Sequence, residues 1–400
     1  MPVWRERSEL VTITKQELAS RHDRVRSALI EGGFDALIAY STAKVAANVR
    51  YLSDYFVRFA GMQNVREGGY HMFGSCAVLY PTEGEPMVRT DQPWDIARAM
   101  EISAFPDTAY AGLFAQDFGP VIRDRRYRRV AIDNWYLFPA REFMALREMA
   151  PDADFVPSHL MSEVRRIKSE SEVESMRRSA ALAVEAVETS LDAVRIGANE
   201  YEVVLLCEEV MRRGGDIELA GGSISGCGPN TSTGSWVPSR TQSRAIEAGE
   251  WVMMDVCPRV DGYAGDISRH RVAGDVSDLD PRLRKMYDVT LLMSEEVRKA
   301  IKPGVTGREL NSLAEQIADR EGLLQNKIGL LGHGLGLDIH DIPDYYYDDS
   351  AISPGEVITV EPCLLLEGVG GVRIEDMVLV TDDGSETLTS AADRELRGSG

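Results

Sequence analysis

The sequence predicts a mixed α/β (α+β) protein of two domains, the second of which is an internal duplication. The chain has 400 residues, which suggests two or three domains at roughly 150 residues each. Helical and strand patterns alternate over residues 1–160, as they do in α/β domains. Residues 161–400 contain segments that recur in the same order at a nearly constant offset.

The composition is that of a folded chain without a basic binding face. Hydrophobic residues make up 44% of the chain and charged residues 27%, which is typical of a folded domain. Acidic residues number 64 against 44 basic ones, so the formal net charge is −20. This excess excludes nucleic acid and anionic membranes as partners, because binding either of them requires a basic surface.

The number and spacing of the cysteines and the hydropathy of the chain indicate the cellular compartment of the protein. No apolar run approaches the roughly 18 residues of a membrane span, and residues 1–15 lack the hydrophobic core of a secretory signal. The five cysteines are odd in number and include no CxxC pair, which favours reduced thiols over a disulfide framework. We therefore expect a cytoplasmic protein.

The first domain begins with a predicted helix at 15–32. Its apolar residues Leu18, Val25 and Leu29 recur at helical spacing, and a pair of glycines ends it. Short apolar runs then predict strands at 36–39, 76–80, 87–88, 130–132 and 155–156. A stretch that contains Arg66 and His71 is predicted to be a loop.

A long helix marks the start of the second domain. Ser169 and Glu172 form a capping-box pattern, and an apolar stripe follows over 173–191. The charged segment just before this helix is typical of a connection between domains. The sequence thus predicts domains at 1–160 and 161–400.

The second domain contains the duplication. Residues 249–255 match 355–361, and in a second pair of matching segments a glycine precedes a new helix cap with glutamate three residues further on. The predicted caps are Asn199 with Glu202 and Thr306 with Glu309. A third match sets 261–268 against 370–377.

The repeat places carboxylates at equivalent positions in the two halves, namely Asp255, Asp266, Glu361 and Glu375. If the halves pack about a local two-fold axis, these four groups meet and repel one another unless cations neutralise them. Carboxylates together with an imidazole suit Mn, Co, Fe or Zn in a two-metal site, and His333 and His340 lie between the halves. For any one of these acids alone, the alternative is an ordinary solvated position at a strand end.

These motifs resemble the pita-bread metallopeptidases, a superfamily that includes methionine aminopeptidase, aminopeptidase P, prolidase and creatinase. Five ordered blocks carry the resemblance, at 255–268, 332–336, 340–343, 360–362 and 371–376. Residues 1–160 resemble the creatinase/prolidase-type N-terminal domain, so the resemblance covers nearly the whole chain. It implies a pita-bread catalytic domain with a pseudo-two-fold repeat, and a homodimer.

The resemblance also implies a binuclear metal centre with two divalent ions. The implied ligands are Asp255, Asp266, His333, Glu361 and Glu375. Asp266 and Glu375 would bridge the two ions. Because all five ligands are present, the metal-free mechanism of creatinase is not expected.

The implied reaction is hydrolysis of a peptide or amide C–N bond, as in Xaa-Pro peptidases, by a water activated between two metal ions. Glu361 would also shuttle a proton. His340 would contact the substrate or the tetrahedral intermediate, and Arg373 would brace a ligand aspartate.

Two positions depart from the family pattern. After the Gly-Pro-Asn turn at 228–230, family members usually carry a histidine where this chain has Ser235, which Trp236 follows. Cys363 replaces the glycine that usually follows Glu-Pro, and we interpret it as a small buried thiol. Ser235 and Trp236 are candidate substrate contacts.

Arg66 and His71 are further candidates for substrate binding, since the corresponding loop of creatinase-like dimers reaches the partner's active site and arginine binds carboxylates bidentately. The alternative for both is a surface loop. The missing histidine also keeps other functions open: a metal-dependent lyase or specialised hydrolase of a small zwitterion, similar to dimethylsulfoniopropionate lyase or ectoine hydrolase, or a non-catalytic binding protein on the same fold.

Overall fold

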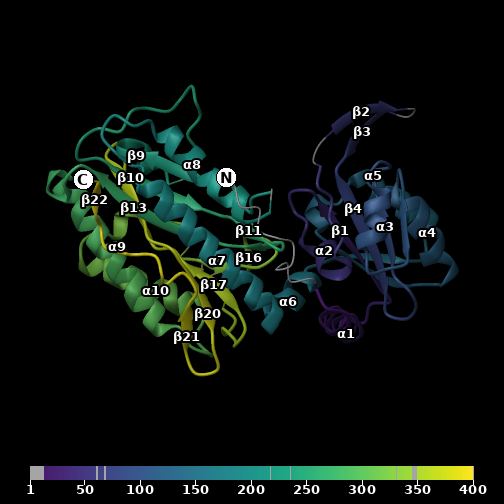
Figure 1. The fold of residues 1–400 in the computed structure, drawn as a ribbon. Helices are drawn as coiled ribbons and strands as arrows, with labels where there is room; N and C mark the ends of the chain where they lie inside the picture. The colour runs from purple at the N-terminus through teal and green to yellow at the C-terminus, as the bar shows by residue number, and fades with distance from the viewer. Residues whose placement is uncertain are drawn as a thin grey trace. The chain divides into compact units, whose positions relative to one another are not determined.

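The computed structural model describes residues 13–59, 62–66, 69–216, 218–234, 236–329, 331–344 and 349–399. The chain divides into two compact units between Arg165 and Arg166, and Figure 1 shows the elements of each. The predicted mixed α/β class is confirmed, since both units combine sheets with helices. Within the described part of the chain, no helix is both long and apolar enough to cross a membrane.

A six-stranded mixed sheet forms the centre of the first unit, in the order β6-β5-β4-β1-β7-β8. Its strands are β1 (Ala36–Thr42), β4 (Ser75–Pro81), β5 (Met87–Thr90), β6 (Asp107–Tyr110), β7 (Arg129–Asp133) and β8 (Asp154–Ser158). Strand β1 pairs antiparallel with β4 and parallel with β7. The helices of this unit are α1 (Lys15–Glu31), α2 (Ala47–Ser53), α3 (Ile96–Ile102), α4 (Phe114–Asp124) and α5 (Ala140–Met149), with a short 3-10 turn η2 (Trp135–Leu137).

The helix at 15–32 and the five strands predicted in this region are confirmed, and each strand is longer than its apolar run. Strand β1 is buried on both faces, which is why it reads as a continuous apolar run instead of an alternating one. Ile38 of β1 and Val130 of β7 belong to a core that also includes Phe118 of α4 and Leu146 of α5.

The prediction of a loop around Arg66 and His71 is wrong. The backbone forms an antiparallel hairpin of β2 (Met62–Arg66) and β3 (Gly69–Phe73), in which Asn64 is opposite His71. Only two residues connect the strands in the sequence, and so short a connection favours pairing of the adjoining segments as a hairpin.

Helix α6 (Leu160–Arg166) spans the division between the units, and the long helix predicted after it is confirmed as α7 (Glu170–Leu191). The Ser169 hydroxyl accepts from the backbone N–H of Glu172, whose carboxylate accepts in return from the backbone N–H of Ser169. This capping box satisfies two N–H groups that the first turn would otherwise leave without partners.

Two larger sheets of the second unit carry the duplicated segments. The first has the order β22-β13-β10-β9 and the second β16-β15-β17-β20-β21. The first comprises β9 (Ile224–Cys227), β10 (Trp251–Val256), β13 (Ile267–Ala273) and β22 (Gly398–Ser399). The second comprises β15 (His333–Gly334), β16 (Asp341–Asp344), β17 (Val357–Val360), β20 (Asp376–Val380) and β21 (Ser385–Thr387).

Smaller sheets and turns complete this unit. They are β14 (Lys327–Ile328) with β18 (Cys363–Leu366) and β19 (Gly370–Arg373), β11 (Arg259–Val260) with β12 (Tyr263–Ala264), and the 3-10 turns η3 (Gly228–Thr233), η4 (Val276–Asp278) and η5 (Leu324–Asn326).

Each half of the second unit has its own helix pair, and the two pairs lie in separate apolar cores. Helices α7 and α8 (Glu200–Gly214) share one core with β10, whereas α9 (Pro281–Ala300) and α10 (Gly307–Arg320) share another with β17 and β20. Figure 1 shows α9 beside α10 next to the yellow-green strands β17 and β20. Isolated bridges recur as well, Asn199 to Ala245 in one half and Thr306 to Ala351 in the other.

The two predicted helix caps differ. Thr306 forms the predicted capping box with Glu309. Asn199 caps α8, but its Oδ1 accepts from the N–H of Tyr201 at 2.9 Å, and no return bond from the Glu202 side chain is present among the described residues. The predicted cap at Asn199 is therefore confirmed, but without a bond from Glu202, because asparagine favours the backbone N–H two residues further on.

Candidate metal centre

Four carboxylates meet where equivalent strands of the two halves end or begin. Asp255 lies in β10 and Asp266 directly precedes β13, while Glu361 directly follows β17 and Glu375 directly precedes β20. The register of β10 and β13 sets Asp255 opposite Ser268. Ser268 then links the halves, because it forms a bridge with Glu375 and its hydroxyl donates to Glu375 Oε2 at 2.8 Å.

His333 supplies an imidazole to this cluster. Its Nε2 lies 3.3 Å from Glu361 Oε1 and 3.7 Å from Asp266 Oδ2. The other ring nitrogen, Nδ1, lies 3.0 Å from the carbonyl oxygen of Gly334, and an N–H there leaves the Nε2 lone pair directed at the carboxylates. A side chain at Gly334 would place its Cβ 2.1 Å from the carbonyl oxygen of Ile342, so only glycine permits this close backbone approach.

His340 lies at the solvent side of the cluster. Its ring stacks on that of His333, with the centroids 3.9 Å apart and an interplanar angle of 11°. His333 is buried, whereas His340 is exposed. The pair therefore runs from the buried carboxylates toward solvent.

Arg373, at the end of β19, holds two of the acids. Its Nη1 forms an ion pair with Asp255 Oδ2, and its Nε lies 3.6 Å from Glu361 Oε2. Its Nη2 donates to the carbonyl oxygen of Gly234 at 3.0 Å. Burial alone would lower the pKa of Arg373, but Asp255 and Glu361 hold it well above its usual value, so the guanidinium stays charged.

The electrostatics of the cluster call for more positive charge than Arg373 supplies. Burial raises the pKa of Asp266 well above its usual value, and the neighbouring Asp255 and Glu361 raise it further. Burial followed by the same kind of repulsion raises the pKa of Glu375. Burial also raises the pKa of Glu361 to about 7. Because like charges in a low-dielectric site cannot all ionise alone, this donor set fits divalent cations.

The donor atoms also lie close enough to share cations. One oxygen or nitrogen from each of Asp266, His333 and Glu375 lies within 4.8 Å of the others. A second such group joins Asp255, Asp266 and a residue absent from the predicted ligand set, Cys257. Asp266 belongs to both groups, which is the position of a bridging ligand.

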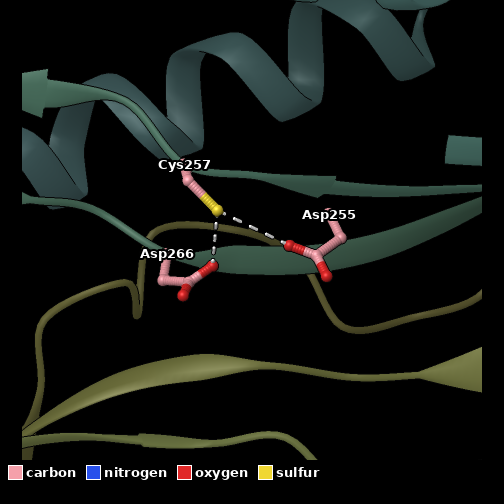
Figure 2. Close-up of side chains that lie close together, drawn as sticks. All are labelled: Asp255, Cys257 and Asp266. Carbon is pink, nitrogen blue, oxygen red and sulfur yellow. Dashed lines mark hydrogen bonds between the residues drawn. The ribbon is translucent and has the colours of Figure 1, made fainter. Parts of the chain in front are cut away.

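The residue that the sequence analysis missed is Cys257. Its Sγ lies 3.2 Å from Asp266 Oδ1 and 3.9 Å from Asp255 Oδ1, and Figure 2 shows the thiol directed at both carboxylates. A signal was present in the sequence, because Cys257 follows Asp255 by two residues as Cys363 follows Glu361. Cys363 itself is buried at the start of β18, opposite Arg373.

The turn η3 is held by Glu200, which is not one of the four clustered carboxylates. The buried Glu200 accepts from the backbone N–H of Cys227 at 2.9 Å and from the side-chain amide of Asn230 at 2.8 Å. Because Gly234 closes this turn and accepts from Arg373, Glu200 helps to orient the arginine.

The structure describes the candidate substrate contacts only in part. The carbonyl of Trp236 accepts from the backbone N–H of Ser225 at 2.8 Å, next to β10, while its indole N–H is buried without a hydrogen-bond partner among the described residues. Ser235 lies outside the described residues. Arg66 and His71 belong to β2 and β3 of the first unit, where the backbone alone is described.

Asp376 next to Glu375 has a structural role. It is buried and accepts from Arg269, Arg394 and Thr389. The two arginines hold the pKa of Asp376 low although burial would raise it. Arg269 also donates to the backbone carbonyl of Glu375 at 2.6 Å, so it helps to fix the strand that carries that acid.

Comparison with known families gives two matches that together span most of the chain. Residues 174–382 match the profile of metallopeptidase family M24, and residues 21–167 match that of the creatinase/prolidase N-terminal domain. The first match includes every residue of the carboxylate cluster described above.

Among curated proteins, the chain is similar to the Xaa-Pro dipeptidases of Pyrococcus furiosus and Pyrococcus horikoshii, at 33% and 32% identity over 238 residues. These alignments cover 59% of this chain and 66% of each relative, which is slightly less than two thirds of the relative's length.

Solved structures show the same architecture over almost the whole chain. A Xaa-Pro dipeptidase from Bacillus anthracis superposes with a TM-score of 0.81 at 26% identity, covering 95% of this chain and 99% of that one. The prolidase from Pyrococcus horikoshii superposes with a TM-score of 0.79 at 25% identity, covering 94% and 99%. The predicted pairing of an N-terminal domain with a pita-bread domain is thereby confirmed.

Proposed function

Because the chain belongs to metallopeptidase family M24, we propose that it is a metal-dependent hydrolase that cleaves the C–N bond of a small Xaa-Pro peptide. The observation that carries this proposal is the convergence of five donor residues from both halves of the second unit. These residues are Asp255, Asp266, His333, Glu361 and Glu375. The relatives described above are Xaa-Pro dipeptidases and prolidases, and they give no support to the lyase alternative.

The cofactor in this proposal is a pair of divalent ions, Mn, Co, Fe or Zn. In this proposal Asp255, Asp266, His333, Glu361 and Glu375 would hold the ions, with Asp266 and Glu375 able to serve both. Divalent ions in such a site polarise the scissile carbonyl and make water a nucleophile near neutral pH.

Glu361 is the group that moves the proton. Burial raises its pKa to about 7 in the metal-free site, and a carboxylate beside the attacking water can accept a proton from it. Its side chain is 13% exposed, against 5% for Asp266, so it faces the accessible side of the cluster. It takes the proton of the attacking water and delivers it to the leaving nitrogen.

Arg373 and His340 assist this proton transfer, one by positioning carboxylates and the other by contacting the substrate. Arg373 contacts both Asp255 and Glu361, so it keeps the two carboxylates in position without contacting the reacting bond. His340 is an exposed imidazole stacked on a buried one, which suits a donor to the substrate carbonyl or to the charge that develops on it.

The remaining substrate contacts extend the proposal. Trp236 has a buried indole N–H without a partner among the described residues, and a bound peptide would satisfy it. Ser235 stands beside it in the sequence and is proposed as a second contact to the peptide. Arg66 and His71 are proposed to reach the peptide carboxylate from the partner subunit of a homodimer.

We place this homodimer in the cytoplasm. All five cysteines are free in the structure, as expected in a reducing compartment. Size-exclusion chromatography with light scattering measures the mass of the protein in solution. The mass of a monomer at micromolar concentration would contradict the proposed homodimer.

A substrate panel tests the function. The protein is freed of metal, reloaded separately with Mn, Co, Fe or Zn, and offered Xaa-Pro dipeptides, longer Xaa-Pro peptides, dipeptides without proline, and small zwitterions. We expect metal-dependent cleavage of the Xaa-Pro dipeptides, with Asp266→Ala as the inactive control. Turnover of a zwitterion without cleavage of any proline peptide would refute the peptidase proposal.

A further inference from the structure

We propose that the Cys257 sulfur is itself a metal ligand, which turns the Asp255 side of the centre into a mixed sulfur–oxygen site selective for a thiophilic divalent ion. This inference rests on the proposed function, since it assumes that the carboxylate cluster holds divalent ions. It goes further by assigning a ligand outside the five inferred from the sequence and by narrowing the choice of metal.

The geometry of Figure 2 supports the assignment. The sulfur lies 3.2 Å from one Asp266 oxygen and 3.9 Å from one Asp255 oxygen. A zinc-like ion, with sulfur at about 2.3 Å and oxygen at about 2.0–2.2 Å, keeps adjacent sulfur and oxygen ligands about 3.0–3.6 Å apart. The first distance falls in this range, and the second reaches it by a shift of a few tenths of an ångström.

The surroundings of Cys257 are those of a ligand more than of a core thiol. The residue is buried, yet it is absent from the apolar core that α7 and α8 form with β10. Its polar neighbours are the carboxylate oxygens of Asp255 and Asp266. On the other side Gly221 leaves room, since a Cβ there would lie 3.3 Å from the sulfur.

The matched cysteine of the second half has a different environment. Cys363 occupies the same place after Glu361 that Cys257 occupies after Asp255. It starts β18 in register with Arg373, and the charged groups that act on its thiol are Arg373, Glu361 and Asp255. At Cys363 the guanidinium of Arg373 would compete with a cation for the sulfur, so Cys363 is the natural control for Cys257.

The chemical consequence is a difference between the two metal positions. On binding an ion, the Cys257 thiol would release its proton to solvent, and the resulting thiolate favours zinc and cobalt over manganese. Carboxylates with a single imidazole also accept manganese. The group of Asp255, Cys257 and Asp266 therefore binds the softer ion, and the group of Asp266, His333 and Glu375 binds with oxygen and nitrogen alone.

Cobalt substitution tests this assignment without reliance on activity. Co(II) bound to the full-length protein shows weak visible bands wherever it binds, and an intense near-ultraviolet charge-transfer band only when a thiolate coordinates it. We expect this band in the wild type and in Cys363→Ser, and its loss in Cys257→Ser with the visible bands retained. In equimolar zinc and manganese, Cys257→Ser should lower the zinc-to-manganese ratio, measured by elemental analysis, about tenfold or more.

The outcomes separate this inference from the proposed function. Visible cobalt bands without a charge-transfer band in the wild type would overturn the sulfur ligand and leave the metallohydrolase intact. Loss of the band in Cys363→Ser would overturn it equally. No cobalt binding at all would overturn both proposals. If Cys257→Ser does not fold, a variant that keeps Cys257 as its single cysteine is used instead. The sulfur ligand predicts that this variant retains the charge-transfer band, and absence of the band would overturn the inference.

Discussion

The two halves of the catalytic unit present the same pair of carboxylates but different partners for them. In the first half, Asp255 and Asp266 lie on and beside paired strands, and a thiol accompanies them. In the second half, Glu361 and Glu375 occupy the equivalent places, and this half also supplies His333 and Arg373, which contact Glu361 and extend to Asp266 and Asp255 of the first half. Strand pairing thus places carboxylates at equivalent positions in both halves. The thiol, the imidazole and the guanidinium come from positions that are not equivalent in function between the halves.

The two cysteines show how local structure causes this difference. Cys363 lies in a paired strand, so the register with β19 directs it to Arg373. Cys257 lies in the irregular segment between β10 and β11, where no ladder constrains it, and its sulfur turns to the carboxylates. Equivalent positions in a duplicated fold therefore need not share a function.

The largest effect is expected where the two halves meet. Asp266→Ala removes the residue that belongs to both ligand groups, and we expect kcat/KM to fall by more than about a thousandfold, with fewer ions bound per chain. Kinetics and elemental analysis measure this. The exposed Asp349→Ala, which loses only a surface ion pair with Arg308, is the control and should keep full activity. Unchanged turnover in Asp266→Ala would mean that the halves do not share a ligand.

A second prediction concerns the burial of the acids at the junction of the two halves, with the repulsion from Asp255 adding to it. An unfolded glutamate ionises near 4.5, whereas Glu361 in the folded metal-free site has a pKa of about 7, so the folded state binds more protons in between. The metal-free protein should therefore lose stability as pH rises from about 4.5 to about 7, by about 3 kcal/mol from Glu361 alone.

Urea unfolding at several pH values measures this loss. Metal-loaded protein should not show it, because the cations favour the ionised carboxylates. In the metal-free protein, Glu361→Gln should make the free energy of unfolding less dependent on pH. A free energy of unfolding that increases between pH 4.5 and 7 in the metal-free wild type would contradict the raised pKa.

Arg373 sharpens the comparison, because it joins an acid from each half. Arg373→Lys keeps the charge but cannot contact Asp255, Glu361 and the carbonyl of Gly234 together. We expect metal affinity and kcat/KM to fall about 10- to 100-fold while the thermal midpoint changes little. Isothermal titration with zinc measures the affinity. A wild-type affinity in this variant would show that the arginine is not a positioning residue.

The smallest effect compares the two helix caps. Glu309→Ala removes the return bond to the backbone N–H of Thr306 and should lower the free energy of unfolding by about 1 kcal/mol. Glu202→Ala, at the equivalent place in the first half, should change it by less than about 0.5 kcal/mol, because the Glu202 side chain makes no such bond among the described residues. Denaturant titration of the metal-free protein distinguishes them, and equal losses would contradict the difference seen here.

Much of the fold was predictable because its signals are local. The helix at Lys15–Glu31 follows from apolar spacing, the start of α7 from the pairing of Ser169 with Glu172, and β1 from one buried apolar run. The hairpin of β2 and β3 was not predicted, because Val65, Tyr70 and Phe73 are scattered among polar residues without a strict alternation, and pairing of the two segments defines the strands.

The sequence by itself determined the duplication, the four acids and the histidines, because a repeat and its charged positions can be read along the chain. Only the tertiary structure decided which atoms meet. The bridge of Ser268 with Glu375 joins residues more than a hundred positions apart, and the contacts of Arg373 with Asp255 and Glu361 depend on the registers of separate sheets. The place of Cys257 depends on an irregular segment, and no periodicity in a sequence specifies the backbone dihedrals of such a segment.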